Sequence, residues 1–290
     1  MRQHMPQLFD HGGSMQIKSL TAISLIGLIL LFSKTTLAGP QAELVFGILP
    51  LKSPVTLFKQ FAPLRDYLSQ TLQREIVIET ARNYEEFVAR SQARRYDLLL
   101  TAPHFTLLAL DSGHYDVRAT YSTPLVAVVI VHRNNPIDSV QELANQRIAT
   151  PPASAIITLA GKRYLAQQGL DGDTAPYYQT YQSHNASLLA VSAGRSDAAI
   201  ASIHPFRHLL AAGHPLRRLA TTPQLPAMGL LVARDLPAPL QQQFENSLTA
   251  LQHSKEGRQI LKQIGYPGFR TVTPQEFEPA RAFLPATLKD

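Results

Sequence analysis

The stretch that decides the fold is Ser183-His184-Asn185-Ala186-Ser187-Leu188-Leu189-Ala190-Val191-Ser192-Ala193-Gly194-Arg195-Ser196-Asp197-Ala198-Ala199-Ile200. Ser183 or Asn185 suits a helix N-cap, because its side-chain oxygen accepts a free backbone N–H. A small apolar face follows at helical spacing, formed by Ala186, Leu189, Ala190 and Ala193. Gly194 then stands where a helix ends and the backbone turns left-handed, and residues 198–201 are typical of a short buried strand. The stretch therefore predicts one half of a βαβ unit.

His184 lies at the start of that predicted helix, between Ser183 and Asn185. Free N–H groups and the helix dipole favour an anion at such a position. An imidazole there can donate a hydrogen bond to an oxyanion, and its pKa can lie near the working pH. The three residues are therefore candidate ligand contacts, with an exposed histidine beside a helix cap as the alternative interpretation of His184.

The pattern His-x-Ala-x-x-x-Ala-Val-x-x-Gly-x-x-Asp, over residues 184–197, resembles the phosphate/phosphonate-type (PhnD-like) substrate-binding proteins of bacterial ABC importers. The resemblance covers roughly residues 44–269. It implies an α/β periplasmic-binding-protein type II fold, in which two lobes, each a mostly parallel sheet flanked by helices, are joined by two crossings and close over a ligand. It also implies a small anionic solute and an ABC permease as partners, with no cofactor.

Composition narrows the class of protein. The 290 residues suffice for one large domain or two medium ones, and 45% hydrophobic and 17% charged residues are an ordinary globular balance. The absence of cysteine excludes disulfides, thiolate metal sites and a lipid-attachment cysteine. The net charge of +6 is scattered without a basic run, so we expect no nucleic-acid partner, whereas a modest positive field suits an anionic ligand.

The N-terminus is typical of an export signal. Lys18 precedes the apolar run 20–32, and Thr36-Leu37-Ala38 offers a small-x-small cleavage site. The run is short for a membrane span. Residues 1–38 are therefore predicted to be a signal peptide for export to the periplasm, with Met15 as an alternative start and an uncleaved anchor as the alternative interpretation.

Strands and helices are expected to alternate from residue 44 onward. Strands are predicted at 44–49, 76–79 and 96–100, and a helix at 55–71 that Pro63 should kink or break. Ligands in such sheets meet the loops at the carboxyl ends of the strands. The candidate residues in these loops are Lys52, Arg82, Thr101 and His104. A solvated Arg82 is the alternative to a cleft charge.

Two crossings divide the predicted chain into lobes. The first is placed at 122–124 and the return at 219–226, where two prolines favour an extended path. Lobe 1 is then 39–122 plus 224–290, and lobe 2 is 123–223. Strand 229–233 belongs again to lobe 1, and a long helix is expected over 239–253. We expect a monomer.

A second helix tip follows Pro152-Ala153-Ser154. In the resembled family this turn reads Asp-Pro-x-Ser-x-Ser-Gly, and its hydroxyls hold phosphoryl oxygens. Here Pro152 and Ser154 remain, whereas Ala155, Ile156 and Ile157 replace the Thr, Ser and Gly that would follow. Each hydroxyl bond lost to an oxyanion costs about 1.5–3 kcal/mol, so we expect a less charged or more apolar ligand. A plain N-cap is the alternative interpretation of Ser154.

Residues 101–106 stand where that family has Gly-Pro-x-x-Tyr, and the tyrosine position falls on Thr106. Phe105 then lines the pocket or is a core aromatic, and His104 faces the pocket. His204 and His208 are spaced for a metal on one helix face, but Pro205 places His204 outside the helix, so no metal site is predicted.

Enzyme motifs are missing: there is no P-loop, Gly-x-Ser-x-Gly, His-Glu-x-x-His or dinucleotide fingerprint. The sequence therefore predicts an exported solute-binding protein for an ABC importer, not an enzyme. A periplasmic sensor that docks on a membrane receptor or kinase is the alternative, and an enzyme of the same fold is the third. The central expectation is that the helix tips near Ser154 and His184 converge on one gap.

Overall fold

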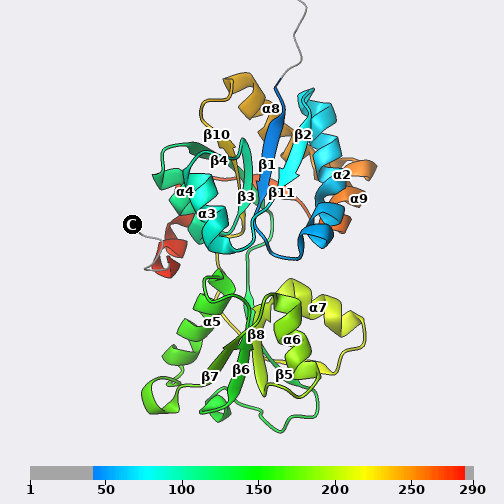
Figure 1. Cartoon of the computed structure of the whole chain (residues 1–290). Coiled ribbons are helices and arrows are strands. Elements are labelled where there is room, and N and C mark those ends of the chain that lie inside the picture. The colour runs from blue at the N-terminus through cyan, green and yellow to red at the C-terminus, as the bar shows by residue number, and fades with distance from the viewer. Residues whose placement is uncertain (1–41, 285–290) are drawn as a thin grey trace, which may run out of the picture. The chain divides into compact units, whose positions relative to one another are not determined.

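The computed structural model describes residues 42–284. The predicted signal peptide, its cleavage site and the alternative start at Met15 all lie outside the described residues. Within the described part, strands and helices alternate as expected and form two separate sheets (Figure 1). No helix of residues 42–284 has both the length and the apolar character that crossing a membrane requires.

The first sheet has six strands, in the order β11 (Phe269–Thr271), β4 (Tyr115–Tyr121), β10 (Gly229–Ala233), β3 (Leu98–Thr101), β1 (Leu44–Ile48) and β2 (Ile76–Glu79). β1 runs parallel to β2 and β3, whereas β10 is antiparallel to β3 and β4, and β11 is antiparallel to β4. Its helices are α2 (Pro54–Leu72), α3 (Tyr84–Gln92), α4 (Pro103–Asp111), α8 (Ala238–Ala250) and α9 (Lys255–Ile264).

The second sheet has five strands, in the order β7 (Tyr177–Thr180), β6 (Arg147–Thr150), β8 (Ala198–Ser202), β5 (Ala127–His132) and β9 (Leu216–Thr221). β6 runs parallel to β7 and β8, and β5 is antiparallel to β8 and β9. Its helices are α5 (Ile156–Gln167), α6 (His184–Ser192) and α7 (Ile203–Ala211). Short 3-10 segments complete the described chain: η1 (Gln141–Leu143), η2 (Gly172–Thr174), η3 (Leu251–His253) and η4 (Pro274–Phe283).

Both sheets are mixed, so the expectation of mostly parallel sheets is wrong. The parallel pairs come from strand–helix–strand units, as the sequence indicated. The antiparallel pairs all involve the strands next to the crossings and the C-terminal β11, because the chain leaves the first sheet through β4, enters the second through β5, and returns from β9 to β10.

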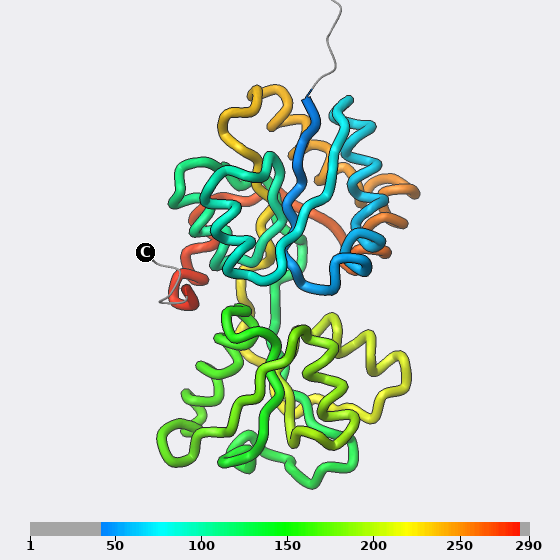
Figure 2. The backbone as a smooth tube through the Cα atoms, in the orientation of Figure 1, coloured from blue at the N-terminus to red at the C-terminus, as the bar shows by residue number. Residues whose placement is uncertain are grey.

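The two crossing segments are hydrogen-bonded to each other. Leu125 and Leu225 form an isolated antiparallel bridge, in which each backbone N–H donates to the other's carbonyl, at 3.1 and 2.8 Å. Figure 2 shows these two segments, green and yellow, passing between the sheets. These two segments, paired at this one bridge, connect the two sheets and are called the hinge below.

Of the kink or break predicted at Pro63, the break does not occur, because α2 is continuous over Pro54–Leu72. A proline inside a helix leaves the carbonyl four residues earlier without its N–H donor. Here that carbonyl belongs to Lys59, and the side chain of Gln263 donates to it at 3.0 Å. The lost backbone bond is replaced by a contact from α9.

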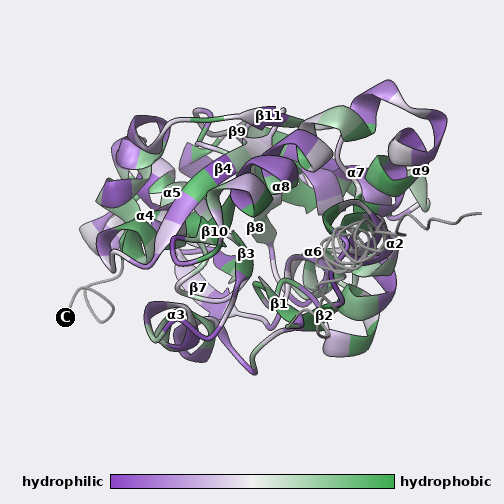
Figure 3. Cartoon of the chain, turned by 90° about the horizontal axis from the view of Figure 1, so that it is seen from above, coloured by the Kyte–Doolittle hydropathy of each residue, from purple (hydrophilic) through white to green (hydrophobic). Residues whose placement is uncertain are grey.

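The core lies in the sheets. Every residue of β3, β8 and β10 is buried, and the hydropathy colouring of Figure 3 shows green strands such as β1 and β8 between helices with purple surfaces. Burial of these mainly apolar strands on both faces indicates helices on each side of each sheet. This arrangement leaves the loops at the strand ends free to form a site.

Candidate functional site

Five helices begin at the wall of one cavity of about 1140 Å³. The N-cap residues of these helices all line it: Ser53 of α2, Ala102 of α4, Ala155 of α5, Ser183 of α6 and Ser202 of α7. Loops from the first sheet supply two of these residues and loops from the second sheet supply three. The cavity therefore lies between the two lobes, at the carboxyl ends of the strands that precede the helices.

Four of these helix starts are left without a side-chain cap. Within the described chain, α2, α4, α5 and α7 begin with no capping hydrogen bond from the N-cap side chain. Only α6 is capped, by the Ser183 hydroxyl, which accepts from the Ala186 N–H at 3.2 Å. First-turn N–H groups have no partner inside the helix and carry the positive end of its dipole. Helices α2, α4 and α7 each have a proline without an N–H in this turn, so α5 and α6 offer the most such groups. The cavity wall is therefore suited to an anion.

His184 occupies the first turn of α6 and contacts α7. Its Nδ1 accepts the Ser202 backbone N–H at 3.3 Å, so in the neutral ring the proton lies on Nε2. Burial lowers the pKa of His184 to about 4. His184 is thus a neutral N–H donor at the cavity wall, and the predicted pKa near the working pH is wrong because the ring is desolvated.

Five of the ten predicted site residues line this cavity, and they are Lys52, Ala155, Ser183, His184 and Asn185. The helix tips near residues 154 and 184 thus line the same cavity. Lys52 lies at the rim, where partial burial lowers the pKa of its amine.

The other five lie beside the cavity or away from it. Thr101 and Phe105 are buried, and Phe105 packs edge-on against Tyr84 at 5.8 Å between ring centroids, so it is a core aromatic. Arg82 is exposed and pairs with Glu86 at 3.1 Å, which agrees with the solvated alternative. His104 and Ser154 are described next.

His104 and Ser154 join the two lobes. His104 is fully buried, and its Nε2 donates to the Ser154 carbonyl at 2.9 Å. The Ser154 hydroxyl donates to Glu85 of α3 at 2.9 Å. Burial lowers the pKa of His104 to about 4, so the ring is neutral. These residues therefore hold the start of α5 against the first lobe, and neither lines the cavity.

Sequence reasoning missed two tyrosines at the cavity. Tyr121 ends β4, and its ring stacks on Tyr266, from the loop after α9, with centroids 3.5 Å apart. The Tyr121 hydroxyl is buried and has no partner among the described residues. Tyr121 directly precedes the predicted crossing at 122–124. That position could have identified it as a cavity residue, because strand ends beside a crossing face the cleft.

His204 and His208 also line the cavity. His204 lies inside α7, contrary to the expectation from Pro205, because a proline in the first turn loses no helical hydrogen bond. Its ring contacts Tyr266 at 5.0 Å between centroids. Within residues 42–284, no group of three or more potential metal ligands gathers.

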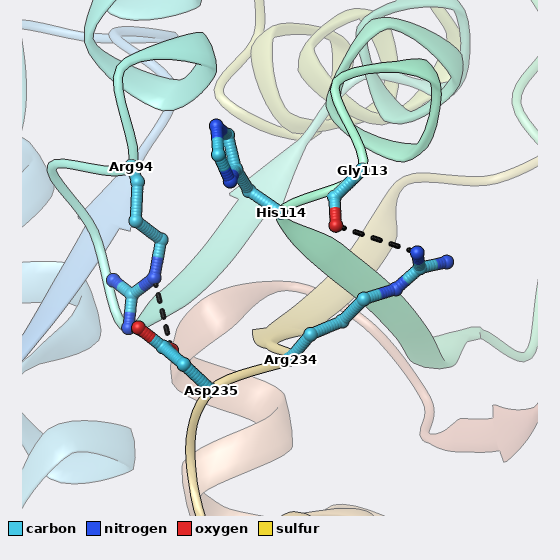
Figure 4. Close-up of a pocket in the computed structure, with 5 residues that line it drawn as sticks. All are labelled: Arg94, Gly113, His114, Arg234 and Asp235. Atoms are coloured by element: carbon cyan, nitrogen blue, oxygen red, sulfur yellow. Dashed lines mark hydrogen bonds and ion pairs between the residues drawn. The ribbon is translucent and has the colours of Figure 1, made fainter.

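A smaller hollow of about 360 Å³ lies elsewhere, lined by the loops that follow α3, precede β4 and follow β10 (Figure 4). Its arginines are already paired: Arg94 binds Asp97 and Asp235 at 2.9 and 2.6 Å, and Arg234 binds Asp116 at 2.8 Å. Its charges are therefore used within the fold, and the larger cavity is the candidate site.

Comparison with known proteins bears on this geometry. The family model described as "ABC transporter, phosphonate, periplasmic substrate-binding protein" matches residues 46–277. PhnD1 from Prochlorococcus marinus, solved in complex with methylphosphonate, is 18% identical, with a TM-score of 0.77 over 84% of this chain and 97% of that one.

Two further solved structures share the fold. A binding-protein component of a phosphonate ABC transporter from Pseudomonas aeruginosa is 17% identical, with a TM-score of 0.73 over 84% of this chain and 85% of that one. A Xanthomonas citri protein, XAC2383, solved with a bound chloride ion, is 18% identical, with a TM-score of 0.70 over 84% of this chain and 97% of that one.

Proposed function

Because the chain belongs to the family of periplasmic substrate-binding proteins of phosphonate ABC transporters, we propose that it captures a small oxyanion in the cavity between its lobes and delivers it to an ABC permease. The observation that carries the proposal is the convergence of five helix N-caps on that one cavity. First-turn N–H groups and the His184 Nε2–H supply hydrogen-bond donors, and a captured anion would complete them.

Several narrower proposals accompany it. Residues 1–38 act as a signal peptide that exports the chain to the periplasm. Residues 39–122 with 224–290 form one lobe and 123–223 the other, in agreement with the strands that each sheet contains. The protein works as a monomer, binds no nucleic acid and performs no catalysis, because lobe closure around the solute is sufficient for recognition by a permease.

Ligand-dependent stabilisation tests the proposal. Thermal unfolding of the purified full chain is measured with phosphate, phosphite, methylphosphonate, methanesulfonate and acetate. A ligand that binds only the native state stabilises it, by about 2.7 kcal/mol at a concentration 100 times Kd. We expect at least one oxyanion to raise the Tm in a concentration-dependent way, and a normally folded chain that none of them stabilises would contradict the proposal.

The variant Asn185→Asp makes the test local. Asn185 lies in the first turn of α6 at the cavity wall. A carboxylate there interacts favourably with the helix dipole and repels a bound anion. We expect unchanged or higher stability without ligand and at least about tenfold weaker anion binding. Asn246→Asp, on the exposed side of α8, is the matched control and should leave binding unchanged.

A further inference from the structure

The charged groups of the cavity wall share one sign. The charged groups that line it are three lysines, Lys52, Lys59 and Lys262, and three histidines line it as well, His184, His204 and His208. Among residues 42–284, no aspartate or glutamate lines the cavity. The nearby Glu85 accepts the Ser154 hydroxyl, and Glu86 pairs with Arg82 and Arg90. An ammonium group on a ligand would therefore lose its hydration without gaining a carboxylate partner.

The same wall offers apolar surface next to the anion donors. Ile156 and Ile157 form the first turn of α5, so the helix tip that presents free N–H groups also presents two buried aliphatic side chains. Leu125 and Met228, both buried, line the cavity on the side of the first lobe and the hinge. An oxyanion held at the α5 tip would therefore have its substituent against apolar side chains.

The Tyr121 hydroxyl is a candidate polar contact for a ligand in this cavity. Tyr121 is 1% exposed, lines the cavity and has a hydroxyl with no partner among the described residues. Burial holds the pKa of Tyr121 well above its ordinary value, so the hydroxyl keeps its proton. A buried donor without a partner costs about 1–3 kcal/mol, and a ligand oxygen would remove that cost.

We propose that this cavity selects an oxyanion whose organic part is apolar and carries no positive charge, such as an alkyl- or arylphosphonate or the matching sulfonate, and discriminates against aminoalkyl zwitterions. The proposal rests on the solute-binding role proposed above and names the class of solute. The volume of about 1140 Å³ exceeds the range of about 300–1,000 Å³ that is usual for small-molecule pockets, so an aryl group has room.

Isothermal titration of the full chain with an isosteric pair tests the proposal. Propylphosphonate and 2-aminoethylphosphonate differ by a methyl group in place of an ammonium group. We expect propylphosphonate to bind at least about tenfold more tightly, because the ammonium finds no counter-charge, and phenylphosphonate and benzenesulfonate to bind as well as propylphosphonate or better. Equal or tighter binding of 2-aminoethylphosphonate overturns the inference. If only inorganic phosphate binds, the inferred selectivity is wrong but the proposed capture of a solute stands. If no anion binds, the proposed function itself is wrong.

Variants at Thr56 test whether the missing carboxylate sets this selectivity. Thr56→Glu places a carboxylate on the cavity wall at the third residue of α2, where a negative charge interacts favourably with the helix dipole and so preserves the fold. We expect it to shift the ratio of the two affinities toward 2-aminoethylphosphonate by about tenfold, whereas the uncharged control Thr56→Gln should keep the ratio of the parent chain. An unchanged ratio in a folded Thr56→Glu variant contradicts the inference.

Tyr121→Phe removes the unpartnered hydroxyl. We expect propylphosphonate to bind about five- to tenfold more weakly, and the stability without ligand to hold or rise, because an unsatisfied buried group is removed. The matched control is Tyr115→Phe, whose hydroxyl donates to the Tyr96 carbonyl at 3.0 Å away from the cavity. It should lower stability and leave affinity unchanged. Unchanged affinity in Tyr121→Phe contradicts the contribution of this hydroxyl.

Discussion

At the scale of single residues, the buried histidines make the protein sensitive to acid. His104 is fully buried, its Nε2 donates to the Ser154 carbonyl, and its Nδ1 has no partner among the described residues. Burial lowers its pKa from 6.5 to about 4. Between these two values the unfolded chain binds a proton that the native chain does not, so the free energy of unfolding falls as the pH falls from about 6.5 to 4.

His104→Gln tests this titration. The glutamine amide can still donate to the Ser154 carbonyl but cannot titrate. We expect chemical denaturation at pH 7, 5.5 and 4 to show a loss of stability in the parent chain that is smaller in the variant, by up to about 3 kcal/mol at pH 4. His253→Gln, at an exposed position after α8, is the control and should follow the parent chain. Equal acid sensitivity in His104→Gln and the parent would contradict the assignment.

At the scale of elements, close packing of α5 on β8 depends on one glycine. A Cβ added to Gly161 would lie 2.5 Å from Cγ2 of Ile200, which is fully buried. Real Cβ atoms do not approach so closely, so Gly161→Ala must displace the strand side chain or the helix. Overpacking of this kind costs about 1–3 kcal/mol.

A double-mutant cycle measures that contact. We expect Gly161→Ala to lower the free energy of unfolding by about 1–3 kcal/mol, and Ile200→Ala to lower it through the cavity that it leaves. The double variant should be more stable than the sum of the two changes predicts, because the methyl group enters the space that Ile200 vacates. Additive effects in urea denaturation would contradict the proposed clash.

The sequence predicted elements better than it predicted their contacts. The unit from Ser183 to Ile200 forms as expected: Ser183 caps α6, Gly194 has φ of +69°, and β8 is buried. These signals are local. The buried face of α6 was predicted only in part: Ala190 is buried as expected, but Leu189 and Ala193 are exposed. The other buried residues are Ser187, Leu188 and Val191. Which face meets the sheet depends on the position of β8, which the helix sequence does not encode.

The candidate site was likewise predicted where its signals are local and missed where it depends on distant contacts. Ser183, His184 and Ala155 were found because each begins a helix after a strand, and topology places such tips together. Tyr121 and Tyr266 lie 145 positions apart in the printed sequence, and they meet only because β4 and the loop after α9 pack together beside the hinge. No spacing in the sequence indicates that contact.

At the scale of the whole molecule, binding should be read out as motion about the Leu125–Leu225 bridge. The chain has no cysteine, so pairs of introduced cysteines give unambiguous spin-label positions. Asn246→Cys with Tyr177→Cys places one exposed label on each lobe, and Asn246→Cys with Arg82→Cys places both on the first lobe.

We expect propylphosphonate to shorten and narrow the distance distribution of the first pair and to leave the second pair unchanged, because lobes close as rigid bodies. The measurement is double electron–electron resonance on the folded variants. Identical distributions with and without saturating ligand, in a variant that binds normally, would contradict closure about this bridge.

The uncapped helix starts lower the stability of the fold. Replacing alanine by serine, threonine, aspartate or asparagine at an N-cap adds about 0.5–2 kcal/mol of stability, and the N-cap residues of α4 and α5 are Ala102 and Ala155. Directed evolution for heat resistance alone is therefore expected to substitute Ala102 and Ala155. The hydroxyls or carboxylates gained there would occupy the same N–H groups that an anion needs. The more heat-resistant variants selected in this way are expected to bind the solute more weakly and so to deliver less of it.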